Sequence, residues 1–132
     1  MIVYLAHPID HAEGNDHGAT DAAVALAEAG FTAVYDPAAA WHGSANPIDD
    51  AMAVQTINLA AMTRANAVLA LLPAGVTTVG TPIEVFQATE LGIPAVVVAS
   101  RSSLVLEWLG VDVVQDTNTA AAMLYELARG NA

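Results

Sequence analysis

The residue best suited to chemistry in this sequence is Glu84, which follows the small-residue stretch Gly80-Thr81-Pro82-Ile83. Proline is favoured in the first turn of a helix, so the stretch predicts a helix over residues 82–91 that carries Glu84 in its first turn. The helix dipole and free N–H groups there would keep the carboxyl group ionised, and a carboxylate can act as a nucleophile. Acidic residues also occur near helix N-termini for stability alone, and the local pattern favours neither interpretation.

Other polar candidates follow apolar segments that are typical of strands. His7 and Asp10 follow the first such segment, Trp41 follows the second and Thr78 follows the third. In a parallel α/β sheet the ligand crevice lies beyond the carboxyl ends of the strands, so these side chains are candidates for binding. His7 either contacts a ligand or forms a hydrogen bond at a strand end, and Trp41 either stacks on a ligand or anchors its loop.

The elements that would position these residues follow from the apolar pattern. Five short apolar segments predict strands over residues 2–6, 31–35, 67–72, 95–99 and 111–114. Helices are predicted over residues 20–30, 47–64, 82–91 and 117–129, with a loop over residues 36–46 and with Thr20 or Asp21 as the first helix cap. Continuous apolar strands joined by helices indicate a parallel sheet covered on both faces. The predicted fold class is α/β, a doubly wound five-stranded parallel sheet in a flavodoxin- or Rossmann-like three-layer sandwich, with residues 1–132 as a single domain.

The composition excludes several classes of protein. The chain has 132 residues, 55% of them hydrophobic, and its 3 basic and 14 acidic side chains give a formal charge of −11. The sequence has no lysine and its arginines are far apart, which excludes a basic surface for polymeric DNA or RNA. No segment reaches the roughly 18 apolar residues of a membrane span, and the N-terminus lacks the features of a signal peptide. We therefore expect a cytoplasmic protein that does not bind membranes.

Metal and thiol chemistry is not expected either. The chain has no cysteine, which excludes disulfides and thiolate zinc sites. His11, His17 and His42 have aspartates nearby but lack the fixed spacing of metal ligands on one element. We therefore expect neither a metal nor a cofactor.

Two motifs together resemble a known family. The segment Val3-Tyr4-Leu5-Ala6-His7-Pro8-Ile9-Asp10, with Gly80-Thr81-Pro82-Ile83-Glu84, Ala88 and Gly92-Ile93-Pro94-Ala95-Val96, resembles the nucleoside 2-deoxyribosyltransferases, a family that includes nucleotide N-glycoside hydrolases. The resemblance implies that Glu84 attacks C1′ of the deoxyribose, expels the base and leaves a covalent glycosyl enzyme, which water or a second base resolves. It also implies that Tyr4 orients the nucleophile, and that Pro8, Gly80 and Thr81 belong to the substrate site.

The sequence departs from the family pattern at two places that bear on the reaction. His7 stands where many members have glycine, which brings an imidazole to the strand end. Asn58 stands where the family usually has an aspartate that contacts the base or manages protons. An asparagine forms hydrogen bonds but cannot relay a proton, which puts efficient base exchange in doubt.

Two further departures give conflicting indications about the substrate. Thr78 occupies a position that is aspartate in several transferases and serine in nucleotide hydrolases, so its hydroxyl favours the hydrolase branch. Asp10 stands where nucleotide-hydrolysing relatives tend to carry an arginine for the 5′-phosphate, and only Arg64 and Arg101 are expected near the crevice. Repulsion from a fixed carboxylate is harder to evade than a missing hydrogen bond, so an uncharged nucleoside is favoured.

The leading hypothesis is therefore an enzyme that cleaves the N-glycosidic bond of a (2-deoxy)nucleoside. A nucleoside 5′-monophosphate N-glycoside hydrolase is the close alternative, and a non-catalytic nucleoside-binding sensor is the alternative of another class. A phosphoribohydrolase of the lysine-decarboxylase-like group and a flavodoxin-type electron carrier are both disfavoured by their missing motifs. The expected partners are a small nucleoside or nucleotide and a free base. Because relatives share active sites between subunits, the resemblance also implies a homodimer or higher homo-oligomer.

Overall fold

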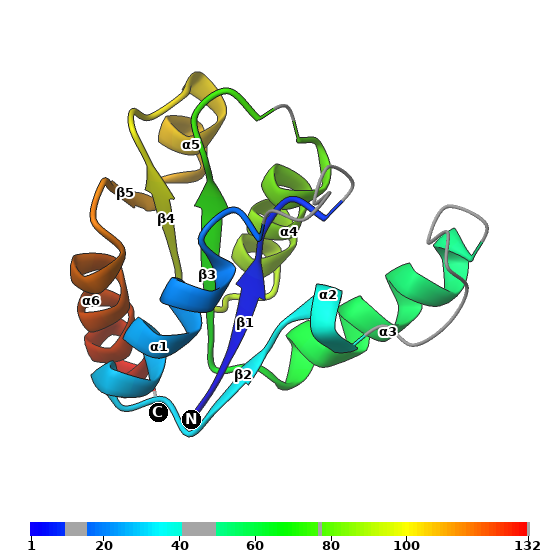
Figure 1. Ribbon diagram of the computed structural model, residues 1–132, viewed down its shortest axis with the longest axis horizontal. Helices are drawn as coiled ribbons and strands as arrows, with labels where there is room; N and C mark the ends of the chain where they lie inside the picture. The colour runs from blue at the N-terminus through cyan, green and yellow to red at the C-terminus, as the bar shows by residue number, and fades with distance from the viewer. Residues whose placement is uncertain (10–15, 41–49, 77, 132) are drawn as a thin grey trace.

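A computed structural model describes residues 1–9, 16–40, 50–76 and 78–131 of the chain (Figure 1). Its centre is a five-stranded sheet with the strand order β2-β1-β3-β4-β5, and every pair of neighbours is parallel. The strands are β1 (Ile2–Ala6), β2 (Ala33–Tyr35), β3 (Ala67–Leu72), β4 (Ala95–Ala99) and β5 (Asp112–Val114). The predicted α/β fold with a five-stranded parallel sheet is confirmed.

The apolar runs form strands because the sheet is covered on both sides. One face packs against α1 (Ala19–Ala29) and α6 (Thr117–Gly130), which lie next to each other in Figure 1. The other face packs against α3 (Ala51–Arg64), α4 (Gly80–Glu90) and α5 (Leu104–Leu109), mainly through Met62, Val85 and Leu106. Alternate residues of β1 thus enter two different cores, and Val3 to Ala6 are all fully buried.

The strand order creates the place for a site. From β1 the chain passes to β2 on one side, whereas β3 lies on the other side of β1. The order therefore reverses between β1 and β3, and the connections that leave these two strands at their carboxyl ends diverge. A crevice at such a point is the usual ligand site of a doubly wound sheet.

Two short helices were not predicted from the sequence. The segment after β2, expected to be a loop, contains α2 (Pro37–Ala40), and Asp36 Oδ1 accepts a hydrogen bond from the N–H of Ala38 at its start. In α5, Ser103 caps the N-terminus by accepting a hydrogen bond from Leu106 N, and Gly110 closes the helix with φ of 71°. Both helices are too short to show a clear apolar period, so only their caps mark them.

Several predicted boundaries were wrong. Helix α1 begins at Ala19, because Asp16 accepts hydrogen bonds from the N–H groups of Gly18 and Thr20, so neither Thr20 nor Asp21 is the cap. Helix α4 begins at Gly80 rather than at residue 82. The second strand begins at Ala33 rather than at residue 31. Among the described residues, no helix is long and apolar enough to cross a membrane.

Candidate active site

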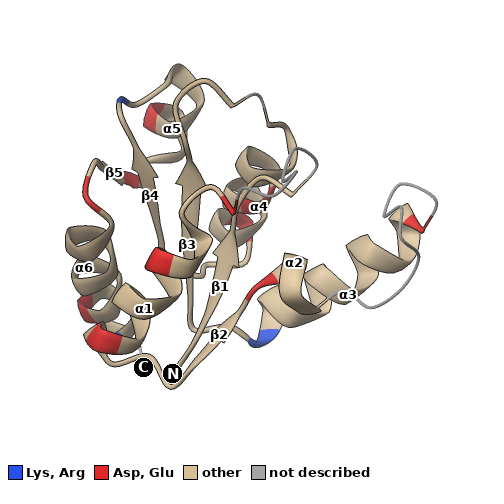
Figure 2. Cartoon of the chain, viewed as in Figure 1, with Lys and Arg blue, Asp and Glu red and all other residues tan. Residues whose placement is uncertain are grey.

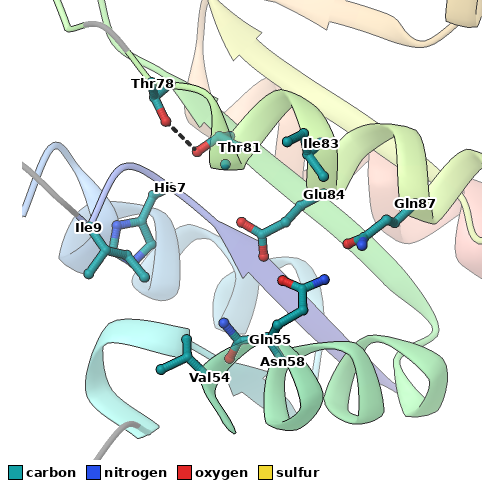
Figure 3. Close-up of a pocket in the computed structure, with 11 residues that line it drawn as sticks. His7, Ile9, Val54, Gln55, Asn58, Thr78, Thr81, Ile83, Glu84 and Gln87 are labelled. Carbon is teal, nitrogen blue, oxygen red and sulfur yellow. Dashed lines mark hydrogen bonds between the residues drawn. The ribbon is translucent and has the colours of Figure 1, made fainter. Parts of the chain in front are cut away.

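A cavity of about 250 Å³ lies at the carboxyl ends of β1 and β3, where the strand order reverses. Its walls come from the end of β1, one side of α3, the segment before α4 and the first two turns of α4 (Figure 3). The lining residues are His7, Ile9, Val54, Gln55, Asn58, Thr78, Gly80, Thr81, Ile83, Glu84 and Gln87. The site residues predicted at His7, Asn58, Thr78, Gly80, Thr81 and Glu84 thus surround one cavity.

The Glu84 carboxyl group projects from α4 into this cavity (Figure 3). Burial raises its pKa from an ordinary value of 4.5 to about 7, although the hydrogen bond from Tyr4 and the charge of His7 lower it. The expectation that Glu84 lies in the first turn of its helix was wrong. Because α4 starts at Gly80, Glu84 lies beyond the first turn, where a helix dipole acts more weakly on a carboxyl group.

Tyr4 holds the Glu84 carboxyl group from the sheet. Its ring is fully buried, and its hydroxyl donates a hydrogen bond to Glu84 Oε2. Burial, followed by the charge and hydrogen bond of Glu84, raises the pKa of Tyr4 far above its usual range, so the phenol keeps its proton. The Tyr35 ring stacks on Tyr4 with 5.4 Å between the ring centroids. Tyr4 is therefore a fixed donor to Glu84, and its catalytic role stays a prediction.

His7 lies in the cavity wall and forms hydrogen bonds at the strand end, whereas its contact with a ligand stays a prediction. Its Nε2 is 2.6 Å from Asp36 Oδ1, and its Nδ1 is 3.2 Å from the Pro8 carbonyl oxygen. Burial lowers the pKa of His7, but the hydrogen bond and charge of Asp36 outweigh it and the net shift is upward. Burial raises the pKa of Asp36, but the hydrogen bond and charge of His7 and the N–H groups of Ala38 and Ala39 together outweigh burial, so the net shift is downward.

Asp36 is a site residue that sequence reasoning missed as a partner of His7. It was considered as the first residue of a predicted loop. The available signal was its position, because Asp36 directly follows β2 and His7 directly follows β1. Since β1 and β2 are parallel neighbours, residues that follow them meet at the same edge of the sheet.

Carboxamide side chains line the cavity from two helices, α3 and α4. Gln55 and Asn58 extend from α3 toward Glu84 (Figure 3), and the Tyr35 hydroxyl donates a hydrogen bond of 3.2 Å to Asn58 Oδ1. Gln87 lines the cavity from α4. Gln55 and Gln87 were also missed, although each lies three residues from a predicted site residue, a spacing that places both side chains on one helix face.

The remaining predicted site residues have different placements. Thr78 donates a hydrogen bond of 3.5 Å to the hydroxyl of Thr81, which is buried at the start of α4. Pro8 does not line the cavity, but its carbonyl oxygen contacts His7. Asp10 and Trp41 lie outside the described residues.

Basic side chains are few and widely separated on the molecule (Figure 2). Arg64 is the last residue of α3, and Arg101 lines a different cavity beyond β4. Arg129 is exposed on α6 and pairs with Glu126. The expectation that Arg64 and Arg101 lie near the crevice was wrong, since neither lines the Glu84 cavity. Within the described ranges, no group of three or more histidine, aspartate or glutamate residues could hold a metal ion.

Comparison with known proteins identifies this architecture. No protein-family model and no curated protein match the chain. Solved structures do match: the 2-deoxyribosyltransferase of Bacillus psychrosaccharolyticus superposes with a TM-score of 0.74 and 17% identity over 92% of this chain and 90% of that enzyme. The 2-deoxyribosyltransferase of Leishmania mexicana superposes with a TM-score of 0.67 and 16% identity over 95% of this chain and 97% of that enzyme. A CMP N-glycosidase of Clostridium botulinum superposes with a TM-score of 0.62 and 17% identity over 96% of this chain and 99% of that enzyme.

This chain has the fold of these transferases and of the glycosidase. The likeness covers nearly the whole of each chain, so the fold is shared from the first strand to the last helix. One fold supports many reactions, and the side chains of the cavity must therefore carry the argument about function.

Proposed function

We propose that this protein cleaves the N-glycosidic bond of a (2-deoxy)nucleoside through a covalent glycosyl intermediate on Glu84. The observation that carries the proposal is the position of the Glu84 carboxyl group in a cavity at the carboxyl edge of the sheet. There its Oε2 accepts a hydrogen bond from the Tyr4 hydroxyl. Because Tyr4 occupies Oε2, the other carboxylate oxygen is left to attack. The fold shared with 2-deoxyribosyltransferases and a CMP N-glycosidase supports the same bond class.

The reaction has two steps. A carboxylate oxygen of Glu84 forms a bond to C1′ as the C1′–N bond breaks, and the base leaves with the electron pair and takes up a proton. Water or the nitrogen of a second base then attacks C1′, loses a proton and releases the Glu84 carboxylate. Dividing the displacement in this way lowers each barrier, because the carboxylate stabilises the oxocarbenium character of both transition states.

The charges in the cavity favour an uncharged nucleoside as the substrate. Glu84 and the Asp36 beside His7 are acidic, whereas neither arginine nor lysine is present among the described lining residues. A 5′-phosphate carries about −1.5 to −2 charges near neutral pH and would find no strong cationic partner there. The carboxamides of Gln55, Asn58 and Gln87 instead suit the donors and acceptors of a neutral base or sugar.

A second candidate is a nucleoside 5′-monophosphate N-glycoside hydrolase. One observation favours it: Thr78 and Thr81 place hydroxyls beside Gly80 at the N-terminus of α4, where free N–H groups attract anions. Under either candidate, Asn58 forms hydrogen bonds in the cavity but does not relay a proton.

The test is product analysis with deoxynucleosides and their 5′-monophosphates, each with and without a second free base. Free base released without an acceptor indicates hydrolysis, and a new nucleoside formed only with an acceptor indicates transfer. The Glu84→Gln variant should lose turnover by at least about a thousandfold, because a neutral amide is a poor nucleophile. The matched control is Glu90→Gln at the exposed far end of α4, which should keep full activity.

Two outcomes would overturn the proposal. Turnover retained by Glu84→Gln would exclude a covalent bond to this residue. Saturable nucleoside binding without any product would favour the sensor hypothesis. A preference for monophosphates over nucleosides would instead select the second candidate.

A further inference from the structure

The two ring nitrogens of His7 both contact oxygen atoms that can only accept hydrogen bonds. Nε2 lies 2.6 Å from the Asp36 carboxylate, and Nδ1 lies 3.2 Å from the Pro8 carbonyl. A neutral imidazole has a single N–H group, so one of its nitrogens would face an oxygen lone pair without a proton between them. Only the imidazolium form satisfies both contacts, and the 4% exposure of His7 leaves little room for water to replace either one.

The groups around His7 favour the same protonation state. Asp36 follows β2, Glu84 approaches from α4, and the charge of His7 also acts on Asp16 before α1. Tyr4 and Tyr35 keep their protons, because burial and the neighbouring carboxylates raise the pKa of both phenols. Helix α3 contributes neutral carboxamides, so the described surroundings of His7 are neutral or acidic.

We propose that His7 is a buried imidazolium that holds Glu84 in its ionised, nucleophilic form, and that Asp36 fixes the charge and orientation of the ring. This inference rests on the proposed function, because it concerns the nucleophile of that reaction. Both N–H groups of His7 are engaged, so the ring does not supply the proton to the leaving base. His7 is therefore a positioning residue that acts through the charge state of Glu84.

Opposite charges in one cavity make the two titrations interdependent. Removing the His7 charge raises the pKa of Glu84 further, and removing the Glu84 charge lowers the pKa of His7, by the same coupling free energy. Activity requires Glu84 to be ionised, and the charge of His7 lowers the pH at which this happens. Activity should therefore rise with pH as Glu84 ionises and stay level at alkaline pH, where Glu84 remains ionised even after His7 loses its proton.

The first experiment reads the charge of His7 directly, without any substrate. Nitrogen-15 NMR of the intact protein follows the imidazole nitrogens, and His7→Gln assigns the His7 signals. At about pH 6.5, where an ordinary histidine is half protonated, His7 should be predominantly protonated on both nitrogens. Its midpoint should fall by about one unit or more in Asp36→Asn and by a smaller amount in Glu84→Gln. A His7 ring that is neutral at this pH would overturn the inference.

The second experiment measures kcat/KM against pH for the His7→Gln variant. The acid limb should move upward by up to about one unit, which is a loss of up to about tenfold below neutral pH and a smaller loss above it. A purely structural role would lower the rate equally at all pH values, and that result would overturn the inference. The matched control is His17→Gln, because His17 does not line the cavity and its replacement should leave the profile unchanged.

The two experiments separate this inference from the proposed function. If no substrate turns over but NMR finds a protonated His7, the proposed function has failed and the charge assignment stands. If the enzyme turns over and its acid limb does not move in His7→Gln, the inference alone has failed.

Discussion

At the scale of single residues, the hydrogen bond that Tyr4 donates to Glu84 opposes the effect of burial on the pKa of the proposed nucleophile. The Tyr4→Phe variant loses a donor that favours the carboxylate, so the pKa of Glu84 should rise above about 7. We expect kcat/KM to fall about tenfold near neutral pH, and less at alkaline pH, because a hydrogen bond to a charged group contributes about 1.5–3 kcal/mol.

A pH profile of the variant beside the wild type measures this effect. The matched control is Tyr125→Phe on α6, which removes a phenol hydroxyl on the other face of the sheet. An acid limb at the same pH in Tyr4→Phe and in wild type would show that the bond does not act on ionisation.

The raised pKa of Glu84 also predicts how stability depends on pH. The folded state holds this proton more tightly than the unfolded state, so ionisation of Glu84 opposes folding. The cost is absent below pH 4.5, grows as the pH rises to about 7 and is complete above that value. Glu84→Gln removes the cost, so its free energy of unfolding relative to wild type should increase by about 3 kcal/mol between about pH 4 and pH 8.

Urea unfolding at the two pH values tests this linkage, and Glu90→Gln serves as its control because Glu90 is exposed. If the free energies of unfolding of Glu84→Gln and of the wild-type protein differ by the same amount at both pH values, the Glu84 carboxyl group is not desolvated in the folded protein.

At the scale of elements, the glycine after α1 determines how that helix packs against α6. Gly30 closes α1 with φ of 120°, and a methyl group added there would lie 2.8 Å from Cε2 of Tyr125. Gly110 closes α5 with φ of 71°, but a methyl group there would meet no atom within 4 Å. Both positions have positive φ, but Gly30 lies further from the left-handed helical region and it alone adds a steric clash.

We expect Gly110→Ala to destabilise the fold by about 1 kcal/mol through backbone strain alone. Gly30→Ala should cost about 1–3 kcal/mol more, because the Tyr125 ring must move. Thermal unfolding of both variants measures the difference. Equal melting temperatures would mean that the α1 and α6 packing adapts without cost.

At the scale of the whole molecule, the face that carries α3 and α5 leaves large apolar side chains in water. Met52 on α3 is 86% exposed, and Leu104 and Trp108 on α5 are 88% and 75% exposed. Helix α3 extends away from the sheet in Figure 1, and within it only Met62 is buried. Because α3 also carries Gln55 and Asn58 into the cavity, a second copy that covers this helix would support the site.

We therefore expect a homodimer that buries α3. Sedimentation of Met52→Asp should find a monomer with reduced activity, because a charge in an apolar interface is costly to bury. Leu104→Asp tests α5 as the alternative surface. If the Leu104→Asp variant is monomeric and the Met52→Asp variant remains a dimer, the interface lies on α5. A wild-type protein that sediments as a monomer would contradict the expectation.

Much of the fold was determined by local sequence. Segments such as residues 67–72 and 95–99 are too apolar to be stable outside a sheet that is covered on both faces, so their order along the chain predicts the parallel sheet. The stretch from Gly80 to Glu84 likewise identified a carboxyl group at the start of a helix that follows a strand. In each case the residues that form the pattern lie within a few positions of the feature that they predict.

The tertiary structure alone decided the chemistry of that carboxyl group. Tyr4 and Glu84 are 80 positions apart and His7 and Asp36 are 29 apart, so these contacts exist only because β1 lies between β2 and β3 with α4 packed on the sheet. Local sequence predicted an ionised glutamate from the helix dipole. Burial is a property of the whole fold, and the loss of hydration in the folded cavity raises the pKa of Glu84 to about 7.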